Sequence, residues 1–138
     1  MPKPGGLLTL LPQTTITTAV TAVTTVAFPT DGLRDLMVEA NFDYGSGGTN
    51  LNIWVQTRVK GGTWRDIMNF NFTTADAVKW SKCSIGTALA AARTASDAAL
   101  SSDTILDGFI GDEIRLKYTS SGTYAGSATI TVLGSAKY

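Results

Sequence analysis

The chain has 138 residues, of which 43% are hydrophobic and 16% charged, and eleven Lys and Arg balance eleven Asp and Glu. This length fits one domain with one core, and a charged fraction below the roughly 25% of an average globular protein suits a surface that partners cover in part. A net charge of zero provides no field to hold phosphates, so we expect no nucleic-acid partner.

The residues that the chain lacks exclude several kinds of site. It has no histidine and one cysteine, Cys83, which removes zinc sites of the Cys/His type, Ser-His-Asp triads and histidine general bases together. We therefore expect no enzyme and no cofactor, and we interpret Cys83 as a small apolar residue of the core. Pro12 and the threonines after it end the apolar residues 7–11 too early for a signal peptide, and no stretch is long enough to span a membrane.

The beginning of the chain predicts an N-terminal arm over residues 1–12, followed by a single domain over residues 13–138. Two prolines and two glycines in residues 1–6 deny regular hydrogen bonding. Residues 7–11 are apolar enough to form a short strand that anchors the arm. Residues 14–28 consist mainly of Thr, Val and Ala, which favours one or two strands, and Pro-Thr-Asp-Gly at 29–32 has the composition of a turn.

Residues 33–44 alternate in the manner of a strand with one buried face. The inward positions are Leu36, Val38, Ala40 and Phe42, and Met37 is the apolar exception on the polar face. Gly-Ser-Gly-Gly at 45–48 is typical of a flexible connection.

Residues 51–72 predict a central hairpin around which the other strands are arranged. Gly61 and Gly62 permit the positive φ angles of a tight turn, and Ile67 interrupts the alternation in a way that indicates a bulge. We expect one face to hold the core and the other to be available for contacts. The expected core residues are Leu51, Ile53, Val55, Met68, Phe70 and Phe72, and the expected contact residues are Trp54, Gln56 and Arg58 with the glycine turn.

The last third of the chain is less regular. Residues 77–84 predict an edge strand protected by lysines, with Trp64 and Trp80 interpreted as core residues. Residues 85–112 predict a long connection with a strand and one helical turn near 97–100, and a connection of this length is usually functional. Residues 113–118 and 127–133 alternate and predict a second hairpin, with Ile114, Leu116 and Tyr118 inward on its first strand and Ala128, Ile130 and Val132 sharing one face of its second.

Seven or eight short strands separated by turns, with no sustained helical pattern, predict an all-β fold. We expect an antiparallel β-sandwich of the jelly-roll or immunoglobulin-like type, and a barrel is the alternative.

The acidic and aromatic residues could form a chemical site, but each group also has a simpler structural interpretation. The acidic groups Asp31/Asp35, Asp97/Asp103/Asp107 and Asp112/Glu113 lack the spacing of a calcium loop, so we interpret them as residues of turns and solvated strand ends, and no metal site is predicted. Tryptophan and tyrosine faces suit stacking on sugars. Trp54 is the one tryptophan expected at the surface, which leaves a carbohydrate- or receptor-binding module as the alternative function.

Four stretches together resemble a known group of proteins. They are WVQTRVKGGTWRDI at 54–67 followed by FNF, GDEIRLKY at 111–118 and SGTYAGSATITV at 121–132. They resemble the hairpin and the later strand of small β-sandwich virion proteins of tailed bacteriophages and prophages, over about residues 33–133. Arg58 and Lys60 depart from the small and acidic residues usual in that turn.

The resemblance implies a structural role in the particle. We expect a capsid decoration or cement protein, or another head-associated or neck-associated component, located in the virion after assembly in the host cytoplasm. Its expected partners are the major capsid protein or neighbouring virion proteins and further copies of itself, with a trimer favoured. The candidate interface consists of Leu7, Leu8, Leu10, Leu11, Trp54, Gln56, Arg58, Lys60, Phe109 and Ile110. The alternative module would belong to a head fibre or to the tail or neck.

Overall fold

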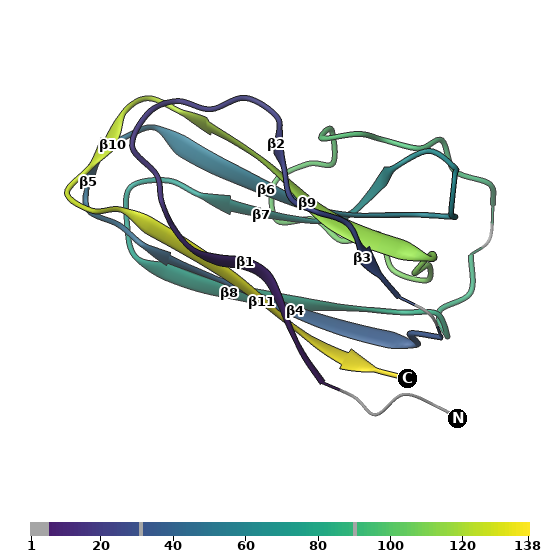
Figure 1. Ribbon diagram of the computed structural model, residues 1–138. Helices are drawn as coiled ribbons and strands as arrows, with labels where there is room; N and C mark the ends of the chain where they lie inside the picture. The colour runs from purple at the N-terminus through teal and green to yellow at the C-terminus, as the bar shows by residue number, and fades with distance from the viewer. Residues whose placement is uncertain (1–5, 31, 90) are drawn as a thin grey trace.

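The computed structural model describes residues 6–30, 32–89 and 91–138, and over these ranges the chain forms eleven strands and no helix. Figure 1 shows two sheets that face one another. Seven of the strands have eight or more residues and four have two, whereas the sequence predicts seven or eight short strands. Every strand pair is antiparallel and neither sheet closes on itself, so the fold is a β-sandwich and the barrel alternative is wrong.

The two sheets are built from strands that are distant in the sequence. Sheet A has the order β1 (Gly6–Thr15), β11 (Thr129–Lys137), β4 (Asp35–Asp43) and β8 (Ala77–Ser84). In sheet B, the short strands β2 (Val23–Thr24) and β3 (Phe28–Pro29) pair with β9 (Glu113–Ser121), which is followed by β6 (Asn50–Arg58) and β7 (Arg65–Phe72). A small third ladder joins β5 (Ser46–Gly47) and β10 (Tyr124–Ala125) at one end of the sandwich (Figure 1).

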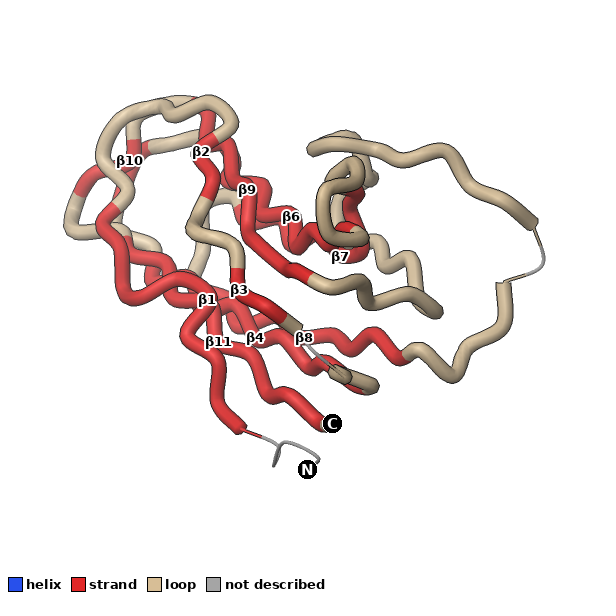
Figure 2. The backbone as a smooth tube through the Cα atoms, turned by 45° about the vertical axis from the view of Figure 1, so that its right-hand side comes forward, coloured by secondary structure: helices blue, strands red, loops and turns tan. Residues whose placement is uncertain are grey.

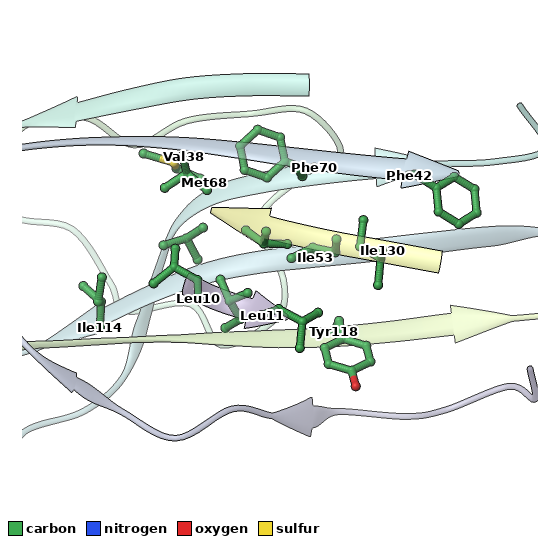
Figure 3. Packing of buried hydrophobic residues seen from close by; sticks show 14 of the residues in the cluster. Leu10, Leu11, Val38, Phe42, Ile53, Met68, Phe70, Ile114, Tyr118 and Ile130 are labelled. Carbon is green, nitrogen blue, oxygen red and sulfur yellow. The ribbon is translucent and has the colours of Figure 1, made fainter. Parts of the chain in front are cut away.

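The core lies between the two sheets, as Figure 3 shows for ten labelled side chains. Period-two alternation places the predicted inward residues of β4 there, and all four are completely buried. The predicted inward residues of β9 and the alternating apolar residues of β11 are buried as well, as are all six core residues of the central hairpin. Cys83 is also buried, which confirms its predicted role.

The first strand differs from the predicted arm. β1 pairs with β11 from Gly6 onward, so the expected boundary between residues 12 and 13 falls inside a strand of sheet A. Register shifts on both sides of Leu11 allow the consecutive residues Leu10 and Leu11 to be buried together. The strand is therefore part of the domain, and residues 1–5 of the expected arm lie outside the described residues.

The segment after β1 contains the two short strands β2 and β3, as the Thr- and Val-rich composition predicts. The predicted turn at 29–32 includes Asp31, which lies outside the described residues.

The predicted second hairpin is wrong. β9 belongs to sheet B and β11 to sheet A, so the chain crosses the sandwich between them. Gly122, Gly126 and Ser127 all have positive φ angles, and β10 lies between these turns. The left-handed turns redirect the chain to the opposite sheet instead of returning it to its neighbour.

The predicted bulge in the central hairpin is confirmed. Val55 is opposite Met68 and Gln56 is opposite Asp66, so Ile67 is the extra residue of β7. Its side chain is buried. β8 is an edge strand of sheet A, as predicted from its lysines.

The connection from residue 85 to residue 112 contains no helix among its described residues, and its one β-bridge joins Ile105 to Met68. The predicted helical turn near 97–100 is therefore wrong. Figure 2 shows this connection, in tan, beside β6 and β7. Backbone hydrogen bonds tie it to the free edge of β7, from Asp66 N to Ser96 O, from Asn69 N to Thr104 O and from Leu106 N to Ile67 O. It thus covers an edge that would otherwise be open.

Candidate functional site

The outer face of sheet B is covered by the long connection, and a buried polar layer joins the two. The Asp66 carboxylate accepts hydrogen bonds from Gln56 Nε2 at 2.8 Å and from the backbone N–H groups of Ala98, Ala99 and Leu100 at 2.9, 2.9 and 3.0 Å. Asp66 is 1% exposed and Gln56 is completely buried. A buried carboxylate is stable when several donors satisfy it, so Asp66 fixes the path of the connection.

Gln56 extends this layer toward β9. Its Nε2 also donates to Asp97 Oδ1 at 2.7 Å, and its Oε1 accepts from Arg115 Nε at 2.8 Å. Asp97 accepts a further hydrogen bond from Lys117 Nζ at 2.8 Å, and this bond, with that from Gln56, holds the pKa of Asp97 below its ordinary value. The side-chain amide of Gln56 thus links β6 to β7, to β9 and to the long connection.

Trp54 is the second surface prediction that the covering connection changes. The side chain is 8% exposed, and its Nε1 donates to Leu100 O at 3.0 Å. Alternation predicts that Trp54 and Gln56 leave the core face of β6, which is correct. Both are buried nevertheless, because residues 96–106 cover that second face.

Arg58 and Lys60 lie at the end of the central hairpin. Arg58 Nε donates to Glu113 Oε1 at 2.9 Å, and the Arg58 guanidinium lies 4.5 Å from the centroid of the Trp64 ring. The Arg115 guanidinium lies 4.3 Å from the same ring. Trp64 is therefore a half-buried side chain stacked with two cations and not a core residue. Lys60 is exposed, and its backbone N–H donates to Asp112.

The remaining candidate interface residues differ in their exposure to solvent. Leu7 is 72% exposed, whereas Leu8 is half-buried against the core. Leu10, Leu11 and Ile110 are buried. Phe109 is half-buried, with the Arg65 guanidinium 5.0 Å from its ring centroid. Within this conformation the buried members offer no surface to a partner.

No segment of the described residues covers the outer face of sheet A, and four large apolar side chains project from it. Leu7, Met37, Val78 and Trp80 are 72%, 42%, 55% and 63% exposed. Cross-strand pairing places Trp80 beside Glu39, which in turn lies beside Leu133, and places Met37 between Ser135 and Lys82. We call this surface, formed by the outward residues of β1, β11, β4 and β8, the open face.

The open face corrects the predicted burial of Trp80. Cys83 is the buried position of β8, and it has the opposite parity to Val78, Trp80 and Lys82. The sequence contained a signal of this arrangement, because Trp80 shares its parity with a lysine, and Met37 interrupts the polar face of β4. Sequence reasoning nevertheless missed Met37, Val78 and Trp80 as contact residues.

Charges of both signs lie on the open face. Asp35, Glu39 and Asp43 recur at every fourth residue of β4, and Lys82 and Lys137 lie on the two neighbouring strands. None of these five exposed side chains forms an ion pair within the described part of the chain. The face therefore combines apolar area with acidic and basic groups, of which Asp35 and Lys137 are cross-strand neighbours.

Two further properties bear on the kind of site. Among the described residues, no three Cys, Asp or Glu side chains gather in an arrangement that would hold a metal ion. Over the same ranges the structure has no helix of the length and apolar character needed to cross a membrane. Comparison with protein families, with curated proteins and with solved structures finds no match.

Proposed function

We propose that the protein is a structural component of a tailed-phage virion that associates with further copies of itself and with the shell through the open face. The observation that carries this proposal is the contrast between the two outer faces. One is sealed by a 28-residue connection over residues 85–112, whereas the other exposes Leu7, Met37, Val78 and Trp80. Several exposed apolar side chains on one face of a soluble domain favour a contact site there.

The chemistry of the open face favours a second copy of the chain as its occupant. A surface with three carboxylates on β4 and lysines on both flanking strands offers each sign of charge to an identical surface. The chain as a whole is neutral, with eleven charges of each sign, so copies do not repel one another through net charge. The virion assignment is supported by the resemblance of residues 54–67, 111–118 and 121–132.

Cross-linking tests which faces meet. Cys83 is buried, so a Glu39→Cys variant carries one accessible thiol at the centre of the open face. A short bifunctional maleimide should join its copies into a covalent dimer at micromolar protein concentration. Val26→Cys is the matched control, because Val26 is 83% exposed on the segment between β2 and β3. Equal cross-linking of the two variants would contradict association through the open face.

The virion role has a separate test. The protein should be present in purified phage particles at a fixed ratio to the major capsid protein, as measured by quantitative mass spectrometry. A protein found only in the lysate, and never in washed particles, would contradict the virion assignment while leaving self-association intact.

The alternative function, a glycan-binding module, now depends on a different tryptophan. Trp54 is buried, but the exposed Trp80 borders a hollow of about 310 Å³ that also contains Asn69, Lys79 and Asp103. An aromatic face beside amide and carboxylate groups is suited to a sugar ring. A glycan-array signal that is lost in Trp80→Ala, from a protein that stays monomeric, would favour this alternative over self-association.

A further inference from the structure

A second site lies apart from the open face, where the long connection meets the start of β7. We propose that the cavity between the start of β7 and the long connection binds a small monocarboxylate with an aromatic or branched apolar body. The inference is independent of the proposed virion role, because none of the residues involved belongs to the open face.

The cavity has the size and lining of a small-molecule site. It encloses about 150 Å³ between residues 65–67 of β7 and residues 89, 91–96, 106, 107 and 109 of the connection. Ile67, Leu89, Leu106 and Phe109 supply apolar walls, and Arg65 and Arg93 supply two cations. An apolar cavity of about 150 Å³ accommodates a benzene ring, which sets the size of the body of the ligand.

Arg65 is the residue whose environment indicates an anionic ligand. Its Nε is buried without a hydrogen-bond partner, and no carboxylate of the described chain forms an ion pair with it. The Phe109 ring lies 5.0 Å from its guanidinium carbon, which holds the group in place. Because Nε itself is closed to solvent, a ligand in the cavity would meet the rest of the half-buried guanidinium, which has no carboxylate partner among the described residues.

The two carboxylates beside the cavity do not fill that role. Asp66 already accepts from Gln56 and from three backbone N–H groups. Asp107 accepts from Ser84 N at 2.7 Å, from Thr87 Oγ1 and from Gly108 N. With their charges held by other donors, Arg65 and Arg93 remain the groups available to a ligand.

The same two carboxylates decide the class of anion. A planar guanidinium binds a carboxylate through two parallel hydrogen bonds. A phosphate monoester carries up to two negative charges at neutral pH, so Asp66 and Asp107, which line the same space, would repel it more strongly than they repel a singly charged carboxylate. We therefore infer a carboxylate and not a phosphate.

Backbone amide NMR with benzoate as the probe tests the proposal. Benzoate should cause saturable shifts confined to residues 65–67, 91–96 and 106–109. Benzamide, which has the same shape without the charge, should bind at least tenfold more weakly, and phenyl phosphate should also bind more weakly than benzoate. Arg65→Gln and Arg93→Gln should each weaken benzoate binding at least fivefold, whereas Lys82→Gln, on the open face, should leave it unchanged.

Arg93→Gln keeps the test decisive if Arg65→Gln perturbs the fold. Arg93 is exposed and has no partner among the described residues, so its substitution should leave the fold unchanged. An Ala92→Phe variant provides a second check, since it fills the cavity and retains both cations; it should abolish the shifts. Benzoate shifts that do not saturate, equal binding of benzamide, tighter binding of phenyl phosphate or wild-type affinity in Arg93→Gln would each overturn the proposal.

Discussion

Gln56 donates from Nε2 to Asp66 Oδ1 at 2.8 Å, across a bulge in the central hairpin and beneath the long connection. The bulge places Gln56 opposite Asp66, and the covering residues 98–100 direct three N–H groups at the same carboxylate. One acidic side chain thereby couples the hairpin to a segment more than thirty residues later in the chain.

Asp66→Ala should destabilise the protein and release the connection from sheet B. The substitution removes the shared acceptor of four buried or half-buried donors, and hydrogen bonds to a charged acceptor are each worth more than neutral ones. We expect a loss of about 3 kcal/mol in urea unfolding and faster hydrogen exchange at residues 98–100. Asp43→Ala, at an exposed position of β4, should change stability by less than about 0.5 kcal/mol. Equal stability of the two variants would show that Asp66 does not hold the connection.

Gly48→Ala should destabilise the corner where β5 meets β10. Gly48 has a φ of 71°, and a Cβ at this position would overlap the ring of the buried Tyr124. Left-handed strain and steric overlap act together, so we expect a loss of about 3 kcal/mol in thermal or urea unfolding. Gly61→Ala separates the two effects, because Gly61 has a φ of 79° and open space around it. This control should lose only about 1 kcal/mol, and an equal loss in both would contradict the role of the Tyr124 contact.

The Cys83 thiol should make the protein less stable in alkali. Burial raises the pKa of Cys83 from an ordinary 9.0 to about 11. Below pH 9 the thiol is neutral in both states, and between pH 9 and 11 it ionises in the unfolded chain while staying protonated in the folded one. The free energy of unfolding should therefore fall by about 2 to 3 kcal/mol over that window.

Urea unfolding from pH 8 to pH 11, compared with Cys83→Ala, isolates this contribution, since the two proteins share every other ionisable group. The variant should lack the extra loss, and parallel curves would contradict the assignment. In the native protein at pH 8, the thiol should also react with a disulfide reagent far more slowly than in urea.

The fold can be predicted from the alternation of apolar and polar residues wherever one face of a strand packs on the core. Leu36, Val38, Ala40 and Phe42 alternate without interruption, and each is completely buried. Ile67 revealed the bulge because it interrupts the same period. These features depend on residues that are adjacent in the sequence, so they are visible in it.

The contact surfaces were harder to predict because they depend on what lies over each sheet. Trp54 and Gln56 do leave the core face of β6, yet residues 96–106 cover them, and no local pattern reports a cover that comes from forty residues away. Trp80 was assigned to the core from its residue type, although its parity with Lys82 indicated the opposite face. The left-handed turns at Gly122, Gly126 and Ser127 lead the chain from β9 in one sheet to β11 in the other. The alternation within each strand does not report which sheet the strand joins.

Sedimentation velocity of the wild type beside Trp80→Lys, Met37→Lys and Val26→Lys tests the central claim most directly. Trp80 and Met37 lie on the open face, and Val26 is an exposed valine elsewhere. The wild type and Val26→Lys should sediment as the same oligomer at micromolar concentration, while a lysine at either open-face position should shift the equilibrium to monomer by at least tenfold in dissociation constant. A wild type that sediments only as a monomer, or open-face variants that assemble like the wild type, would contradict self-association through this surface.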